Sequence, residues 1–345
     1  MSNGMFVLGL GAVLAAVYAL AFRVLPRERW QVAWVFPVSR MADGSWEGVN
    51  FTMYGILTGA SVALATALAL VLMAAAGVPL VWGGILALTV LAVCVPAAGF
   101  LAGIVEGKRH TFSVGAAVFA GVLVTPVLAW VVSKAAGDIS MAGPMIAATG
   151  LAYALGEGTG RLACLSFGCC YGRRIDSLPR PWQRLFGAVA MIFEGRTKKI
   201  AYAHGLDGVP VVPIQAMTAV VCTLIALAGT WFFLSGRMGL AVAIAIGGTQ
   251  LWRFGSEFLR ADFRGRDGIT AYQYMSLGGA AVGIGLASFM APTGGHPDLA
   301  RGLGVLWRPE VLLGLQAVWL GTAWRMGRSR VTGARVELFV RNDLI

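Results

Sequence analysis

The sequence predicts an all-α integral membrane protein with about nine transmembrane helices. Its 345 residues are 58% hydrophobic and only 12% charged, whereas about a quarter of the residues in a soluble domain are charged. Runs of about 18 or more apolar residues recur along the whole chain, and such runs are typical of transmembrane helices. Ten-residue segments of alternating polarity, which predict a membrane β-barrel, do not occur in the sequence. We therefore expect a multi-pass protein of the bacterial inner membrane.

Nine apolar segments account for the predicted helices. They lie at residues 4–25, 52–76, 80–105, 112–135, 140–168, 212–235, 238–259, 270–292 and 305–326. The second and third are separated by little more than the stretch 77-GVP-79, which is typical of a tight hairpin. Arginines follow the first segment rather than precede it, the reverse of the order in a cleaved signal peptide. We therefore expect the first helix to be retained.

The segments between the helices divide the chain into three parts. Residues 26–51 mix arginines with aromatic residues such as Trp30, Trp34, Phe36 and Trp46, which predicts a segment lying at the membrane interface. Residues 170–211 form the largest soluble loop, and the tail 327–345 is basic. The predicted parts are an extra N-terminal helix with its interfacial segment (1–49), a membrane core that includes the large loop (50–292), and an extra C-terminal helix with its tail (293–345).

The chain carries a net charge of +11. In a soluble protein this charge would suggest nucleic acid, but the sequence contains no nucleic-acid-binding motif. In a membrane protein it predicts basic cytoplasmic loops and contact with anionic lipid. Of the 27 lysines and arginines, 21 lie on the odd-numbered loops and the C-terminal tail, and four lie on the other side. The positive-inside rule therefore predicts an N-terminus outside the cytoplasm.

Two arginines lie inside predicted spans. Arg161 is surrounded by apolar residues in 151-LAYALGEGTGRLACLSF-167, a stretch that also contains Glu157. A charge at membrane depth costs about 2.5–3.5 kcal/mol on insertion scales unless it is paired or faces water. One interpretation is an ion pair with Glu157 at i, i+4, or a side chain that reaches the interface. The other is an arginine that binds an anion in a polar cavity.

Arg253 is the second such arginine. Glu257 and Arg260 follow it at i+4 and i+7, and Gln250 precedes it at i−3, so a helix would present all four on one face. A helix end with one ion pair would explain this pattern. Alternatively, two arginines held by one glutamate would offer forked donors to a phosphate group.

The stretch 160-GRLACLSFGCCYGRR-174 contains three of the five cysteines. They are Cys164, Cys169 and Cys170. The CxxxxCC spacing lacks the CxxC pairs of a zinc site, so we predict no metal from it. The cysteines either pack in a crowded turn or include a reactive thiol whose pKa an arginine lowers. Gly168 and Gly172 would let the chain turn sharply at the membrane edge.

These motifs, in this order, resemble the prolipoprotein diacylglyceryl transferase family. The family signature GRxGNFxNGExYG is similar to GRLACLSFGCCYG at residues 160–172. Four further family elements are similar to the following stretches: MYG at 53–55, PIQ at 213–215, WRFGSEFLR at 252–260 and YQYMS at 272–276. The resemblance covers about residues 50–292, and it implies a core of seven helices with one added helix at each end.

The resemblance implies a transferase that needs no cofactor. The family moves the diacylglyceryl group of phosphatidylglycerol to the cysteine thiol of a prolipoprotein, forming a thioether and releasing glycerol phosphate. By motif match, Arg161 and Arg253 would hold the phosphate as its charge grows, and Glu257 would orient Arg253. The remaining residues that the resemblance assigns to substrate binding are Tyr54, Cys164, Gly168, Cys169, Cys170, Gly172, Gln215 and Arg260.

The chain departs from the family at several positions. Cys164 stands where the family has an asparagine, and Cys169 where it has an acidic residue. The family's HGG motif aligns with 113-SVG-115, and His110 lies three residues away. The family's site opens on the outer face, whereas the charge count predicts motif loops inside. Two alternatives therefore stay open: a lipid-modifying transferase with another acceptor, and a lipid-binding or transport protein without catalysis.

Overall fold

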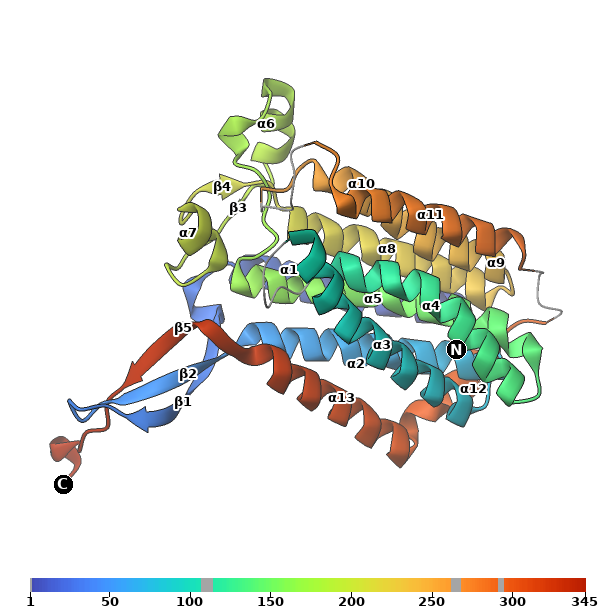
Figure 1. The fold of residues 1–345 in the computed structure, drawn as a ribbon, viewed down its shortest axis with the longest axis horizontal. Coiled ribbons are helices and arrows are strands. Elements are labelled where there is room, and N and C mark those ends of the chain that lie inside the picture. Colours follow the sequence, from blue (N-terminus) through green and yellow to red (C-terminus); the bar gives the residue numbers. More distant parts are fainter. Residues whose placement is uncertain (1, 107–113, 262–267, 291–294) are drawn as a thin grey trace.

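The computed structural model describes residues 2–106, 114–261, 268–290 and 295–345, and most of these residues form helices that pack into a bundle (Figure 1). The longer helices are α1 (Asn3–Val24), α2 (Met53–Ala75), α3 (Leu80–Glu106), α4 (Val114–Ala135), α5 (Ala142–Phe167), α8 (Ile214–Leu234), α11 (Ala271–Ser288) and α13 (Pro309–Gly327). Six helices, α1 to α5 and α8, are long and apolar enough to cross a membrane. A multi-pass helical membrane protein is therefore confirmed, and the count of nine spans stays a prediction.

The predicted span 238–259 is not one regular helix. It consists of α9 (Met238–Val242), a π-helical turn (Ala243–Gly248) and α10 (Thr249–Glu257). π-helical turns widen a helix locally and often occur at functional sites. Because α10 ends at Glu257, Arg260 lies beyond the helix. The prediction that Arg253, Glu257 and Arg260 share one helix face is therefore wrong for Arg260.

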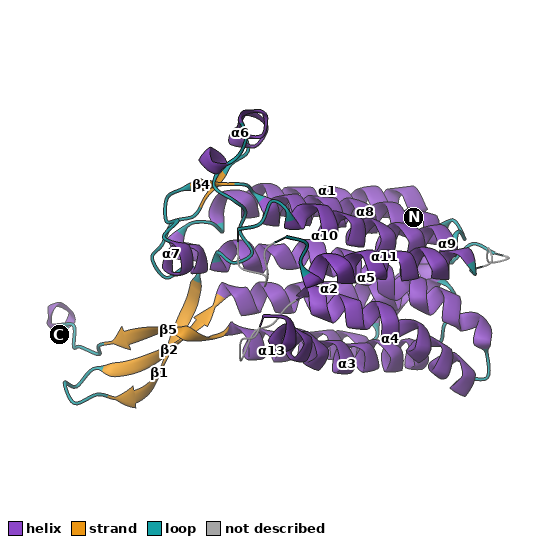
Figure 2. Ribbon diagram, turned by 45° about the horizontal axis from the view of Figure 1, so that its top comes forward, coloured by secondary structure: helices purple, strands orange, loops and turns teal. Residues whose placement is uncertain are grey.

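The all-α prediction is also wrong for two segments outside the helical bundle. β1 (Val32–Arg40), β2 (Trp46–Thr52) and β5 (Arg328–Val336) form an antiparallel sheet in the order β1-β2-β5. The sheet projects from one end of the bundle (Figure 2). Alternating large apolar residues at 32, 34, 36 and 38 favour a strand. Across β1 and β2, the rings of Trp34 and Phe51 stack with centroids 4.5 Å apart.

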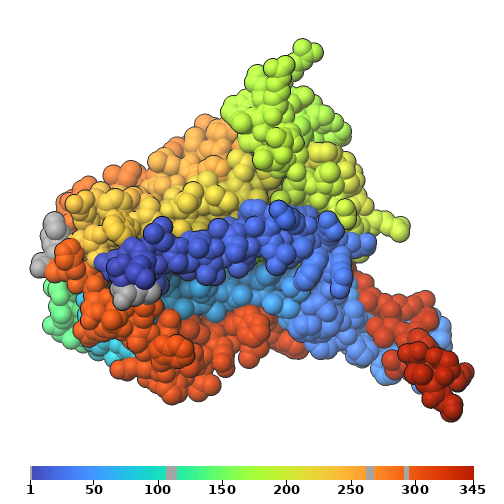
Figure 3. All heavy atoms as spheres, turned by 180° about the vertical axis from the view of Figure 1, so that it is seen from behind, coloured from blue at the N-terminus to red at the C-terminus, as the bar shows by residue number. Residues whose placement is uncertain are grey.

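Helix α5 lies at the centre of the bundle and packs against both α2 and α8. Small residues permit this close packing. A Cβ atom at Gly158 would lie 2.7 Å from Oγ1 of Thr223 and 2.9 Å from the carbonyl oxygen of Ala219, so only glycine fits between α5 and α8. Helix α1 runs lengthwise over the outside of the bundle, as the dark blue spheres of Figure 3 show.

The predicted soluble loop 170–211 folds into short elements at the same end of the bundle as the sheet (Figure 1). These elements are α6 (Arg180–Gly187), β3 (Met191–Ile192), α7 (Lys199–His204) and β4 (Pro210–Val211). Lys198 of this loop is fully buried. Its Nζ donates to the carbonyl oxygens of Ser166 (2.5 Å) and Leu25 (3.2 Å), at the ends of α5 and α1. Burial lowers the pKa of Lys198 to about 8. The loop is thereby fastened to the end of α5.

Candidate active site

One buried glutamate joins the two intramembrane arginines. Glu157 and Arg161 lie one turn apart on α5, and Arg161 donates from Nη2 to Oε1 of Glu157. Arg253 of α10 donates from Nη1 to the same oxygen at 3.0 Å. The Glu157 side chain is only 1% exposed, and the two arginine side chains are 7% and 11% exposed. Within the described residues, Oε2 of Glu157 has no hydrogen-bond partner.

This ion cluster closes one end of an apolar cavity of about 320 Å³ between α2, α3, α4 and α5. Tyr54, Glu157, Arg161 and Cys164 line the same cavity as Met73 does, at the far end of α2. Tyr54 and Met73 are 19 residues apart on one helix, which corresponds to about 28 Å along the helix axis. The cavity is therefore nearly as long as the hydrocarbon core of a bilayer is thick, about 30 Å, and it can accommodate an extended acyl chain.

A second, polar pocket lies next to the cluster. Its lining residues are Arg161, Thr218, Arg253, Ser256, Glu257, Arg260, Tyr272 and Ser276. The pocket has a volume of about 10 Å³, which is enough for about one water molecule. Arg161 lines both spaces, so its guanidinium lies at the boundary between the apolar cavity and the polar pocket.

Arg260 reaches the polar pocket from an extended segment. Its Nε lies 3.9 Å from Oε2 of Glu257, and its backbone pairs with that of Gly172 in an isolated β-bridge. A Cβ atom at Gly172 would lie 2.4 Å from the carbonyl oxygen of Val212. The closing glycine of the 160–174 stretch therefore permits a close approach to Val212, and the β-bridge on Gly172 fixes the backbone of Arg260.

The 160–174 stretch ends α5 in a left-handed glycine, as the sequence predicted for a sharp turn. Gly168 has φ +70°, and its N–H donates to the carbonyl oxygen of Cys164 at 2.9 Å. Gln215, at the start of α8, donates from Nε2 to the carbonyl oxygen of Cys169 at 2.8 Å. Gln215 thus holds the turn against the start of α8. We expected Gln215 to line the headgroup pocket, but it lines neither the cavity nor the polar pocket described above, and its described hydrogen bond is to backbone.

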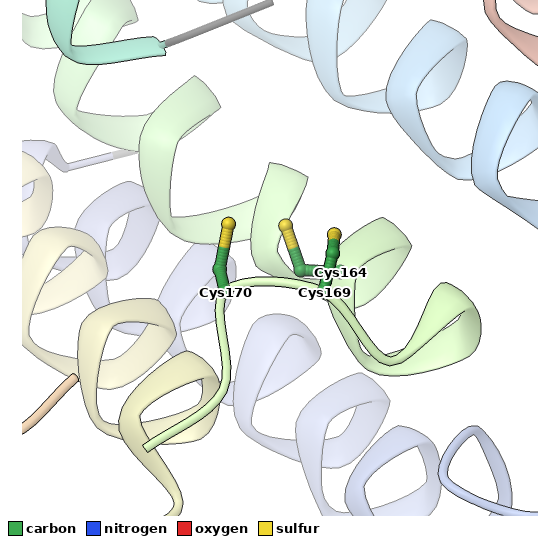
Figure 4. A group of neighbouring side chains, drawn as sticks. All are labelled: Cys164, Cys169 and Cys170. Atoms are coloured by element: carbon green, nitrogen blue, oxygen red, sulfur yellow. The ribbon is translucent and has the colours of Figure 1, made fainter. Parts of the chain in front are cut away.

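The three cysteines of this stretch meet in the folded chain. The sulfur atoms of Cys164, Cys169 and Cys170 all lie within 4.8 Å of one another. Cys164 and Cys169 are buried, and Cys170 is half-buried. Figure 4 shows the three side chains side by side, with their sulfur atoms pointing in the same direction.

The structure thus brings together the predicted residues of α2, α5 and α10, but it changes two details. Arg253 has its described ion pair with Glu157, and Glu257 lies beside Arg260. Sequence reasoning treated Glu157 only as a partner of Arg161, and it missed Tyr153, whose hydroxyl accepts from Gln250 Nε2 at 3.3 Å at the cavity wall. The signal for Tyr153 in the sequence was a polar hydroxyl inside the same predicted span, eight residues before Arg161. His110 and Ser113 lie outside the described residues.

The charges of the cluster favour an anionic ligand. Three arginines and two glutamates leave one positive charge in excess. Arginine guanidinium groups bind phosphate through paired hydrogen bonds. A ligand with a single negative charge and a long apolar part would therefore match both the cluster and the adjoining cavity.

A sequence model described as prolipoprotein diacylglyceryl transferase matches residues 45–289, which is well over half of the chain. This range contains every residue of the ion cluster, both cavities and the cysteine group. A search of curated proteins finds no match.

Proposed function

Because the chain belongs to the prolipoprotein diacylglyceryl transferase family, we propose that it transfers the diacylglyceryl group of phosphatidylglycerol to a cysteine thiol of a prolipoprotein. The bond between the glycerol carbon and the phosphate oxygen breaks, a carbon–sulfur bond forms, and glycerol phosphate leaves. We further propose that this reaction takes place in the bacterial cytoplasmic membrane.

The observation that carries this proposal is the position of Arg161 between two unlike spaces. The acyl chains of the donor lipid would lie in the apolar cavity, and the glycerol phosphate would lie toward the polar pocket. The phosphodiester between them would then lie at Arg161 and Arg253. The leaving phosphate gains negative charge as the carbon–oxygen bond breaks, so the two guanidinium groups would bind the transition state more strongly than the ground state.

Glu157 holds the two arginines in position before the lipid binds. Its carboxylate lies where a phosphate oxygen would accept from the same two donors. Lipid binding would therefore require Glu157 to share these donors or to turn away from one of them. The polar pocket, with room for about one water molecule, would also have to open for glycerol phosphate.

Substitution of the arginines tests the proposal. We expect Arg161→Ala and Arg253→Ala to lower transfer to a thiol peptide by about 100-fold or more, the typical loss when one donor to a developing oxyanion is removed. Arg308→Ala, which changes an exposed arginine paired with Glu310, is the matched control and should keep full activity. Detergent-purified protein, phosphatidylglycerol and a short cysteine peptide suffice for the assay. Full activity in either buried-arginine variant would refute the assignment.

A second acceptor is favoured by the cysteine group. Cys164 and Cys169 replace polar and acidic residues of the family signature. Cys164 lines the apolar cavity, and the sulfur atom of Cys169 lies within 4.8 Å of that of Cys164. Complementation of a strain depleted of its own lipoprotein transferase, with lipid analysis, separates the two possibilities. Restored growth with a lipidated prolipoprotein supports the thiol acceptor, whereas a new lipid product without restored growth selects another acceptor.

A further inference from the structure

The group of three cysteines has the geometry of a metal site, although its spacing in the sequence does not suggest one. All five cysteines lie in the described parts of the chain, and none forms a disulfide. Three of them place their sulfur atoms within 4.8 Å of one another, on one side of the chain (Figure 4). Within the described residues, this group contains no fourth cysteine, histidine or carboxylate.

The backbone of the turn is what directs these sulfur atoms to one side. After Gly168 ends α5, the N–H groups of Gly168 and Cys169 both donate to the carbonyl oxygen of Cys164, at 2.9 and 3.2 Å. The chain therefore folds back over the last turn of the helix. Successive side chains of an extended segment point to opposite sides, but Cys170 adopts a left-handed conformation with φ +56°. This conformation lets two adjacent cysteines face the same space.

A left-handed cysteine is itself informative. Among the described residues, Cys170 is the one residue other than glycine with a positive φ. Glycine adopts this conformation without strain, and asparagine adopts it more readily than most residues. Strained backbone of this kind tends to occur at functional sites. Cys170 therefore adopts a conformation that glycine would adopt more easily.

The turn is also held rigidly from outside the group. Gln215 donates to the carbonyl oxygen of Cys169, and the N–H of Arg173 donates to the carbonyl oxygen of Leu259 at 2.9 Å. Gly172 packs directly against the backbone of Val212. Two segments that are distant in the chain, 212–215 and the residues after α10, thus fix the turn, which is the kind of preorganised support that a ligand site requires.

From this arrangement we propose that Cys164, Cys169 and Cys170 bind one zinc ion as three thiolates, with a fourth position open to the acceptor thiol. Zinc prefers four tetrahedral ligands, and zinc sites that act on substrates keep one position for water or substrate. With a zinc–sulfur bond of about 2.3 Å, neighbouring sulfur atoms of a regular tetrahedron lie about 3.8 Å apart. The three sulfur atoms would have to move together by no more than about one ångström, a small shift for cysteine side chains.

The zinc ion supplies chemistry that the transfer requires, and the inference rests in this respect on the proposed function. The nucleophile in thioether formation is a thiolate, and a thiol that coordinates a metal ion is deprotonated. The incoming cysteine thiol would bind at the open position and release its proton to water. Its sulfur would then attack the glycerol carbon, and the phosphate oxygen would leave with the electron pair of the broken bond. No electron is transferred to the metal, because zinc is not redox-active.

The position of the group agrees with this role. Cys164 follows Arg161 by three residues on α5, so both side chains lie on the same face of the helix, and both line the apolar cavity. A sulfur bound at this group would therefore lie within one helical turn of the arginines that bind the lipid phosphate.

Metal analysis of the purified full-length protein tests the proposal directly. Protein purified anaerobically in detergent should contain about one zinc ion per chain, as measured by elemental mass spectrometry. Cys169→Ser and Cys170→Ser should bind zinc at least about tenfold more weakly in competition with a chromophoric chelator, since loss of even an outer-shell partner commonly costs that much. Cys222→Ala, a buried cysteine of α8 outside the group, is the matched control and should bind zinc as the parent protein does.

Cys170→Gly separates a ligand from a packing residue. Glycine relieves the left-handed conformation, so the metal-free variant should unfold at the same temperature as the metal-free parent or higher. Because zinc stabilises the folded state that binds it, added zinc should raise the unfolding temperature of the parent but not that of the variant. If cysteine served only to pack the turn, the variant would not lose metal affinity. The proposal would be overturned if the parent protein bound zinc no more tightly than a variant in which Cys164, Cys169 and Cys170 are all replaced by serine. Recovery of a disulfide within the group, with no zinc retained under reducing conditions, would also overturn it.

Cobalt substitution tests the open position independently of catalysis. Cobalt bound by thiolates absorbs visible and near-ultraviolet light through charge transfer from sulfur. A short cysteine peptide should intensify this absorption, because a fourth thiolate binds, and the matching serine peptide should leave it unchanged. Peptide binding without lipid transfer would refute the proposed function and retain the zinc site. Transfer that persists at the parent rate in zinc-free Cys170→Gly would refute the role of zinc in activating the acceptor thiol and retain the proposed function.

Discussion

Replacement of Glu157 by glutamine should weaken the folded protein and make its stability depend on lipid. The substitution keeps the size and shape of the side chain but removes the negative charge that Arg161 and Arg253 share. All three side chains are at most 11% exposed, so water cannot replace the lost charge. Removing one partner of a buried ion pair costs about 3–5 kcal/mol. We expect Glu157→Gln without added lipid to lose stability of this order.

Phosphatidylglycerol should restore most of this loss, because its phosphate brings a negative charge to the same two donors. A ligand at about 100 times its dissociation constant stabilises the folded state by about 2.7 kcal/mol. In the parent protein, Glu157 competes with the phosphate for Arg161 and Arg253, so the same lipid should stabilise it less. The gain on adding phosphatidylglycerol, measured by the thermal shift of tryptophan fluorescence, should therefore be larger for Glu157→Gln than for the parent.

Two controls separate charge from mere occupancy of the cavity. Diacylglycerol fills the apolar cavity without bringing a phosphate, and it should stabilise both proteins equally. Glu310→Gln breaks an exposed pair with Arg308, which should change stability by no more than about 1 kcal/mol. If Glu157→Gln is as stable as the parent without lipid, or if diacylglycerol restores it as well as phosphatidylglycerol does, the arginines are not held by this charge as we infer.

Two further predictions concern the scaffold of the site. Gly158→Ala should lower the free energy of unfolding by about 1–3 kcal/mol, the usual cost of overpacking, because its Cβ would lie 2.7 Å from Oγ1 of Thr223. Gly143→Ala on the same helix meets no atom within 4 Å; thermal unfolding should show no comparable loss, and equal effects of both would contradict the packing argument. Lys198 has a pKa of about 8 in the folded chain against 10.5 when unperturbed. The unfolded chain therefore binds more protons in this window, and the contribution of Lys198 to stability should rise as the pH rises from 8 to 10.5. Thermal unfolding across this pH range should show a steeper rise in the parent than in Lys198→Met, and equal slopes would exclude Lys198 as the cause.

The helical part of the fold could be predicted from the sequence because membrane spans are determined locally. Each of the six helices that are long and apolar enough to cross a membrane is a continuous apolar segment whose length matches the thickness of a bilayer. The sheet was missed for two different reasons. The alternation from Val32 to Val38 was a local signal for β1, but the arginines and tryptophans around it favoured an interfacial segment. The pairing of β2 with β5 joins residues near opposite ends of the chain, and no local pattern predicts such a pairing.

The candidate site shows the same division between local and distant information. The spacing of Glu157 and Arg161 on one helix allowed an ion pair to be considered, and the structure contains it. Glu157 and Arg253 lie 96 residues apart in the chain and on different helices, so no local pattern pairs them. The sequence therefore led to Glu257, four residues from Arg253, as the group that orients Arg253. Likewise, the CxxxxCC spacing matches no common zinc motif, because those motifs describe local loops. Here the end of a helix and a left-handed residue bring the sulfur atoms together.

We therefore propose that the face that organises the chemistry is on α5 rather than on α10. Glu157, Arg161 and Cys164 stand at i, i+4 and i+7, and all three line the apolar cavity. These three residues follow one another along the face at intervals of one helical turn. Glu157 holds the arginines, Arg161 would bind the lipid phosphate, and Cys164 carries the first sulfur of the cysteine group. Because the cysteines occupy the end of the helix and the turn after it, they can change how an acceptor is activated without moving Arg161. A change of acceptor chemistry in this chain therefore requires no change in how the donor lipid is bound.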